Sequence, residues 1–295
     1  IESEDPIWDT DIPASEDFTA SNGFWNQDGS KIFFQHDDLS NSENLKIDEI
    51  WYYDINSGER GKVFSDFAIN ADINVDESKF IYHKANIPEY LYEYSVNDNS
   101  IRRLTGTSTT NDLENTILGR YSPDYSKILT TVIAGKPRGI AIMGINGKNA
   151  ELIVEYGIMG GWFPDSKRII YINWVEGSPA KNTKQIFEAN IDGSNQKVLT
   201  DLKNTYRLFN PVVSPDGKTI AFGNDAGEGN SELFLMDYET GEIRQITKGI
   251  GFAESFAWSP DGNKILFDRF IPNVSKRLYL IDTQTLEVEP LFPKL

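Results

Sequence analysis

The stretch SPDGNKILF (259–267) and its near copy SPDGKTIAF (214–222) decide the fold of this chain of 295 residues. Ser-Pro-Asp-Gly is a turn sequence: proline fixes its own backbone angle, aspartate bonds the backbone that follows it, and glycine accepts a positive φ. The apolar residues after the turn, such as Ile265, Leu266 and Phe267, favour a β-strand. Each stretch therefore predicts a tight turn that joins two strands of a hairpin.

The same pattern recurs along the whole chain. Four further stretches share it: WNQDGSKIFF (25–34), NVDESKFIY (74–82), SPDYSKILT (122–130) and FPDSKRIIY (163–171). The six aspartates recur every 41 to 51 residues, at Asp28, Asp76, Asp124, Asp165, Asp216 and Asp261. After each hairpin come another apolar strand, a turn cluster such as ETG (239–241), and a short fourth strand. Six repeats of four strands predict an all-β fold, a six-bladed β-propeller with four antiparallel strands per blade.

The repeat spacing also predicts the domain organisation. We expect residues 18–295 to form a single propeller with blades at about 18–64, 65–105, 106–154, 155–200, 201–247 and 248–295. Blade six supplies four strands of its own, the last at 288–292. Residues 1–17 are acidic and either add a closing strand across the seam of the ring or form a loosely attached tail.

These motifs resemble a known family. SPDG-x-x-I-x-F followed by L-[YF]-L-x-D-x-x-T-G-E is similar to the PD40 repeat of TolB-like propellers, over about residues 18–295. Blades five and six match best, whereas blades two and three lack the glycine and blades one and two lack the proline. The resemblance implies that partners dock at the mouth of the central channel. TolB carries an additional N-terminal α/β domain, for which we expect no room in this sequence, so we do not expect a Tol–Pal role.

Composition narrows the classes of partner and compartment. The net charge of −17 repels phosphate, which argues against nucleic acid and anionic membranes as partners. With no cysteine, the chain has neither disulfides nor thiolate metal sites. No apolar run approaches the roughly 20 residues of a membrane helix, so membrane insertion is not expected. We expect an extracytoplasmic protein, in the periplasm or at the cell surface, and residues 1–17 carry no export signal.

We expect binding on the face formed by the 2–3 and 4–1 connections, because these vary while the other turns repeat. The variable stretches are 36–48, 105–115, 174–184, 223–230 and 268–276. The candidate partner-binding residues at this face are His36, His83, Lys84, Trp174, Asn224, Asp268 and Arg269. The two histidines either meet to hold a ligand or metal, or are plain polar residues of the rim. Tryptophans 25, 162 and 258 occupy equivalent positions and are predicted to pack between blades.

Catalytic motifs do not emerge from the sequence. It contains no G-x-S-x-G elbow and no Walker loop, and two histidines cannot supply a three-histidine metal site. Residues 72–76 begin like a calcium loop but lack the glycine and glutamate that such a loop needs. We predict no catalytic residues and no cofactor, with calcium as the one candidate ion.

The predicted function is a non-catalytic, protein-binding adaptor or assembly subunit of the cell envelope or surface. One alternative is a ligand or glycan sensor that uses the channel, and another is a metal-dependent hydrolase or lyase that uses inward carboxylates. The sequence predicts no particular oligomeric state.

Overall fold

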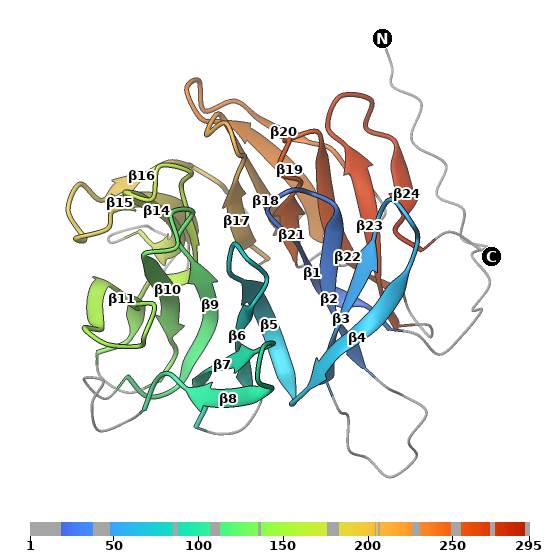
Figure 1. Ribbon diagram of the computed structural model, residues 1–295. Helices are drawn as coiled ribbons and strands as arrows, with labels where there is room; N and C mark the ends of the chain where they lie inside the picture. Colours follow the sequence, from blue (N-terminus) through green and yellow to red (C-terminus); the bar gives the residue numbers. More distant parts are fainter. Residues whose placement is uncertain are drawn as a thin grey trace.

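The computed structural model is a ring of six antiparallel sheets around a central axis (Figure 1). It describes residues 19–37, 48–84, 88–106, 113–134, 137–175, 183–203, 205, 207–225, 231–248, 255–271 and 275–292. Each sheet contains four consecutive strands, and the described residues form no helix. The predicted six-bladed β-propeller with four antiparallel strands per blade is confirmed.

The strands follow the repeat in order. Blade one has β1 (Ser21–Trp25), β2 (Lys31–Asp37), β3 (Asp48–Asp54) and β4 (Arg60–Ser65). Blade two has β5 (Ala68–Ile73), β6 (Lys79–Lys84), β7 (Leu91–Ser95) and β8 (Ser100–Arg103). Blade three has β9 (Thr116–Tyr121), β10 (Lys127–Val132), β11 (Gly139–Gly144) and β12 (Glu151–Glu155). Blade four has β13 (Ile158–Trp162), β14 (Arg168–Trp174), β15 (Lys184–Asn190) and β16 (Lys197–Val198). Blade five has β17 (Phe209–Val213), β18 (Thr219–Asp225), β19 (Ser231–Asp237) and β20 (Ile243–Gln245). Blade six has β21 (Phe256–Trp258), β22 (Lys264–Ile271), β23 (Ser275–Asp282) and β24 (Val288–Pro290).

The repeated turns between first and second strands work as the sequence predicts. The aspartate side chain accepts a backbone N–H two residues further on, for example from Lys218 to Asp216 at 3.0 Å. Side-chain hydrogen bonds, from a serine in five turns and from Arg168 in the turn of Asp165, together with these backbone bonds favour the carboxylate and lower the pKa of the aspartate in all six turns. The next residue has a positive φ of 74° to 76° where it is glycine, and of 56° where it is Glu77, Tyr125 or Ser166. The turn geometry therefore survives in the blades that lack the glycine.

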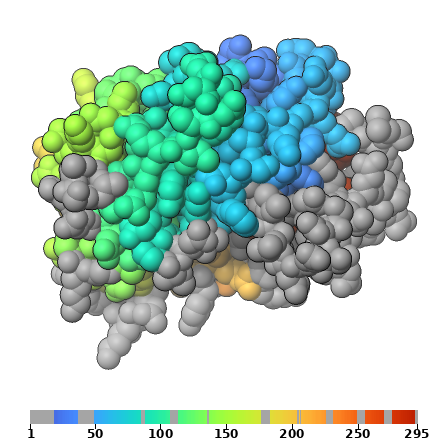
Figure 2. Space-filling model, turned by 60° about the horizontal axis from the view of Figure 1, so that its bottom comes forward, coloured from blue at the N-terminus to red at the C-terminus, as the bar shows by residue number. Residues whose placement is uncertain are grey.

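Apolar residues fill the spaces between neighbouring blades. One cluster joins Leu233 and Leu235 of blade five to Ile265 and Phe267 of blade six. A second joins Leu278 of blade six to residues of blade one, and so lies at the seam of the ring. Figure 2 shows blades one to three, blue to green, side by side on one continuous surface.

In the described part of the chain, packing and one backbone bond close the seam of the ring. The N–H of Ala20 donates to the carbonyl of Lys276 on β23 at 3.1 Å. Within the described ranges no strand is exchanged between blades one and six. Residues 1–17 lie outside the described part, so the closing strand stays a prediction.

Candidate functional site

The first strands of the six blades surround a central channel. It contains a hollow of about 610 Å³, a size typical of ligand-binding cavities. Its wall includes residues of β1, β5, β9, β13, β17 and β21. Prolines of four repeated turns, at positions 123, 164, 215 and 260, also line it. The hollow therefore reaches the face of the molecule that carries the short turns.

A backbone irregularity repeats around this wall. The pairing register between the first and second strands shifts in blades one to five. One residue within each shift has a positive φ of 39° to 56°: Asn22, Asn70, Leu118, Met159 and Asn210. Asparagine tolerates this conformation, whereas leucine and methionine rarely adopt it. Blades three and four thus present apolar side chains to the channel at a position where the other described bulges carry asparagine.

Small residues after the bulge let the blades approach closely. A Cβ at Gly23 would lie 2.6 Å from Leu266 Cδ2 of blade six. A Cβ at Gly160 would lie 3.0 Å from Leu129 Cδ2 of blade three. Real Cβ atoms essentially never come closer than 3.0 Å to such neighbours, so a side chain at Gly23 would force Leu266 to shift, and the contact at Gly160 is already tight.

The equivalent tryptophans link neighbouring blades, as the sequence predicts. Trp162 donates its indole N–H to the carbonyl of Arg120 in blade three at 3.1 Å. Trp258 donates likewise to the carbonyl of Val212 in blade five at 3.2 Å. The indole nitrogen of Trp25, at the seam, is buried and has no hydrogen-bond partner among the described residues. The seam therefore lacks an interblade bond that two other junctions possess.

Asp72 and Arg120 are the only charged residues in the described channel wall. Asp72 accepts the N–H of Ile73 at 3.0 Å and that of Tyr121 at 2.8 Å. Burial raises the pKa of Asp72, and the charge of Arg120 opposes that shift. Burial lowers the pKa of Arg120, opposed in turn by Asp72. The aligned repeats carry a signal for this pair, because the other blades have Phe, Gly, Val or Ala at the same position.

His83 on β6 is buried, with only 5% of its surface exposed, and it is not among the described residues that line the hollow. Its Nδ1 has no hydrogen-bond partner in the described part of the chain. Burial lowers the pKa of His83 to about 4, and the charge of Arg120 adds to the shift. The imidazole is therefore neutral at pH 7. Its predicted role at a partner-binding rim stays a prediction.

Three other predicted site residues are also buried. His36 is 7% exposed, with Nδ1 2.8 Å from the carbonyl oxygen of Thr19. Asn224 is 6% exposed. Asp268 is 1% exposed and accepts the N–H of Ser255, a channel residue, at 2.9 Å.

The remaining three predicted residues lie nearer the surface. Lys84 forms an ion pair with Asp66 at 2.7 Å and sits 4.4 Å from the ring centre of Tyr92. Trp174 is exposed, with Lys184 5.8 Å from its ring centre. Arg269 is half-buried on β22. Most of the loops of their face lie outside the described residues, so partner binding there stays a prediction.

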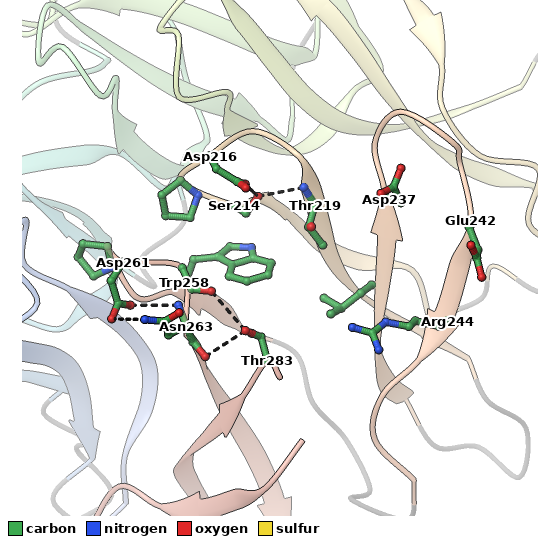
Figure 3. A pocket seen from close by; sticks show the side chains of 14 residues that line it. Ser214, Asp216, Thr219, Asp237, Glu242, Arg244, Trp258, Asp261, Asn263 and Thr283 are labelled. Atoms are coloured by element: carbon green, nitrogen blue, oxygen red, sulfur yellow. Dashed lines mark hydrogen bonds between the residues drawn. The ribbon is translucent and has the colours of Figure 1, made fainter. Parts of the chain in front are cut away.

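A second hollow, of about 850 Å³, lies between blades five and six on the turn face (Figure 3). Among the described residues, Arg244 is the only cation that lines it, together with four carboxylates: Asp216, Asp237, Glu242 and Asp261. The three aspartates already accept bonds from their own turns. Across the described ranges, no group of three or more His, Asp or Glu side chains is arranged to hold a metal ion. No described helix is long and apolar enough to span a membrane.

Comparisons with known proteins agree with this architecture. A family model described as the TolB beta propeller domain matches residues 138–277. Dipeptidyl-peptidase 5 of Porphyromonas gingivalis is 33% identical over 109 residues, which cover 37% of this chain and 16% of that protein. Tol-Pal system protein TolB of Hahella chejuensis is 30% identical over 129 residues, which cover 43% of this chain and 28% of that protein.

Solved structures extend the match to most of the chain. The crystal structure of TolB from Acinetobacter baumannii has a TM-score of 0.70 at 18% identity, covering 89% of this chain and 63% of that one. The predicted resemblance to TolB-like propellers is thereby confirmed. The chain spans less than a third of the two relatives from Porphyromonas and Hahella, one of them a peptidase and the other a Tol–Pal protein.

Proposed function

We propose that this TolB-like six-bladed propeller is a non-catalytic binding module that holds a segment of a protein partner in its central channel. The observation that carries the proposal is the hollow of about 610 Å³ that the first strands of all six blades surround. Its wall combines apolar side chains, such as Leu118 and Met159, with a few polar groups. Such a surface suits a partner segment with apolar side chains and a small number of polar anchors.

The chemistry of the wall supports binding over catalysis. General acid–base catalysis by two carboxylates needs a pair of them, and Asp72 is the only carboxylate in the described wall. Both of its oxygens already accept backbone N–H groups. His83 does not line the described wall, and it is buried and neutral at pH 7.

We propose an extracytoplasmic setting, in the periplasm or at the cell surface. The support is the likeness to Tol-Pal system protein TolB. The finer role, as adaptor or assembly subunit of the envelope, belongs to the same proposal. We also propose that binding needs no cofactor.

Affinity capture with two matched variants tests the channel. The first is Leu118→Asn with Met159→Asn, which makes the wall polar at two positions whose positive φ asparagine tolerates. The control is Tyr156→Asn, since Tyr156 also has a positive φ of 60° but is exposed and does not line the channel. The purified proteins are immobilised, an envelope extract is passed over them, and retained proteins are identified by mass spectrometry.

We expect a protein that the parent and the Tyr156 variant retain and the channel variant loses. A protein that all three retain equally would show that the binding site is not in the channel. If the parent retains none, a stable protein partner is ruled out under these conditions, and ligand or glycan binding becomes the better hypothesis.

A further inference from the structure

Arg120 is the only cation in the described channel wall. The chain as a whole carries a net charge of −17, so a lone arginine in its central cavity is an exception to the prevailing sign. Burial lowers the pKa of Arg120, so the cavity disfavours a charge that lacks an anionic partner. Arginine nevertheless keeps its proton in proteins.

The neighbouring carboxylate of Asp72 does not form an ion pair with Arg120. Asp72 uses both oxygens for the N–H groups of Ile73 and Tyr121. The described structure contains no ion pair of 4 Å or less between Asp72 and Arg120, although the two charges influence each other. Asp72 therefore holds the backbones of blades two and three together, and leaves the guanidinium without a direct anionic contact in the described structure.

The guanidinium is held in place from one side. Its Nη1 donates to the carbonyls of Asn70 and Gly119, both at 3.1 Å. Within the described residues, Nε and Nη2 make no hydrogen bond, and these two donors form one edge of the planar fork. The side chain is thus fixed with an unpaired edge in a cavity that a ligand can enter.

His83, which does not line the hollow as described, also has a ring nitrogen without a partner among the described residues. His83 is 5% exposed, its Nδ1 makes no hydrogen bond within the described part, and it feels the charge of Arg120. Buried polar atoms normally find partners. Arg120 and His83 thus each keep hydrogen-bonding atoms without a partner in the described structure, but of the two only Arg120 lines the hollow.

We propose that Arg120 binds a carboxylate carried by an apolar segment of the ligand, whose apolar side chains pack on Leu118 and Met159. This deepens the proposed function and rests on it. A carboxylate matches the arginine fork with two parallel hydrogen bonds, which a lysine cannot reproduce. The carboxylate comes either from a chain terminus or from an Asp or Glu side chain.

Three synthetic peptides distinguish these sources. The first is N-acetyl-Leu-Phe-Gly-Leu with a free carboxylate, the second is the same peptide as its amide, and the third is N-acetyl-Leu-Phe-Glu-Leu amide. Binding is measured by titration calorimetry, and by the fluorescence of the three tryptophans that line the channel. The protein variants are Arg120→Met, Arg120→Lys, and Arg138→Met as a control outside the channel wall.

We expect the parent to bind one of the two carboxylate peptides about 10- to 100-fold more tightly than the amide, since hydrogen bonds to charged groups are strong. The preferred peptide identifies the source. Arg120→Met should lose that preference, Arg120→Lys should keep only part of it, and Arg138→Met should behave as the parent. Urea unfolding of each variant shows that it is folded.

Equal binding of all three peptides, or a preference that survives in Arg120→Met, would overturn the inference. So would a parent that binds none of them. The outcome is separable from the proposed function: a captured partner lost by the Leu118/Met159 variant but kept by Arg120→Met leaves channel binding intact and removes the carboxylate. Carboxylate binding without any captured protein would keep the role of Arg120 and remove the protein partner.

Discussion

Replacing the interblade tryptophans by phenylalanine should affect stability unequally, although their positions are equivalent. Trp162→Phe removes the bond to the carbonyl of Arg120, and such a bond contributes about 0.5–1.5 kcal/mol net. An unsatisfied buried group costs about 1–3 kcal/mol. Trp25→Phe removes an indole nitrogen that is buried without a described partner, so it relieves a similar penalty. The loss of ring area is alike in both and cancels in the comparison.

The free energy of unfolding should therefore fall by about 1.5–4.5 kcal/mol more for Trp162→Phe than for Trp25→Phe, which is the lost bond of Trp162 plus the relieved penalty of Trp25. The assay is urea unfolding followed by circular dichroism, with the slopes of the transitions compared to check that the denatured states match. Trp258→Phe is the control, since its indole also donates to a neighbouring blade, and it should resemble Trp162→Phe. Equal losses for all three, or a larger loss for Trp25→Phe, would refute the account of the seam.

Three further predictions concern stability and also use urea unfolding. Gly217→Ala should lower the free energy of unfolding by about 1–2 kcal/mol through backbone strain alone, because φ is +74° and no atom lies near the added Cβ. Gly217→Asn should lower it less, since asparagine tolerates this φ, and equal losses would contradict this. Gly23→Ala should cost about 1–3 kcal/mol by forcing Leu266 away, and a neutral result would show that the seam is loose. Between pH 6.5 and about 4 the unfolded chain binds a proton at His83 that the folded chain does not. Stability should therefore fall by about 3 kcal/mol over this range as the pH is lowered, and His83→Gln should remove that dependence; an unchanged profile would contradict the burial of a neutral imidazole.

The repeat made the propeller predictable from sequence, because turn chemistry is local. Asp216 accepts the backbone N–H of Lys218, which is the bond that a Ser-Pro-Asp-Gly turn predicts. The positive φ at Tyr125 and Ser166 was not predictable in the same way. The propeller as a whole holds these residues in a backbone conformation that residues other than glycine disfavour. The same holds for Leu118 and Met159 in the channel wall.

The candidate site was predicted only in outline. The sequence predicted a channel, but burial at the strand ends depends on how the blades pack, and His36, Asn224 and Asp268 proved to be buried. Arg120 was missed. Aligning the six first strands would have found it, because at their second-last position only Arg120 and Asp72 are charged. The repeats specify structure, so residues that depart from the repeat are the better signal for the proposed site.

Photo-crosslinking from two positions tests channel binding most directly. A benzoylphenylalanine is introduced at Met159, in the channel wall, or at Tyr156, which is exposed outside it; both positions have a positive φ and lie three residues apart. Each protein is irradiated with the captured partner, and the products are identified by mass spectrometry. Channel binding predicts a cross-link to the partner from position 159 and none from position 156. A cross-link from 156 with none from 159 would contradict it.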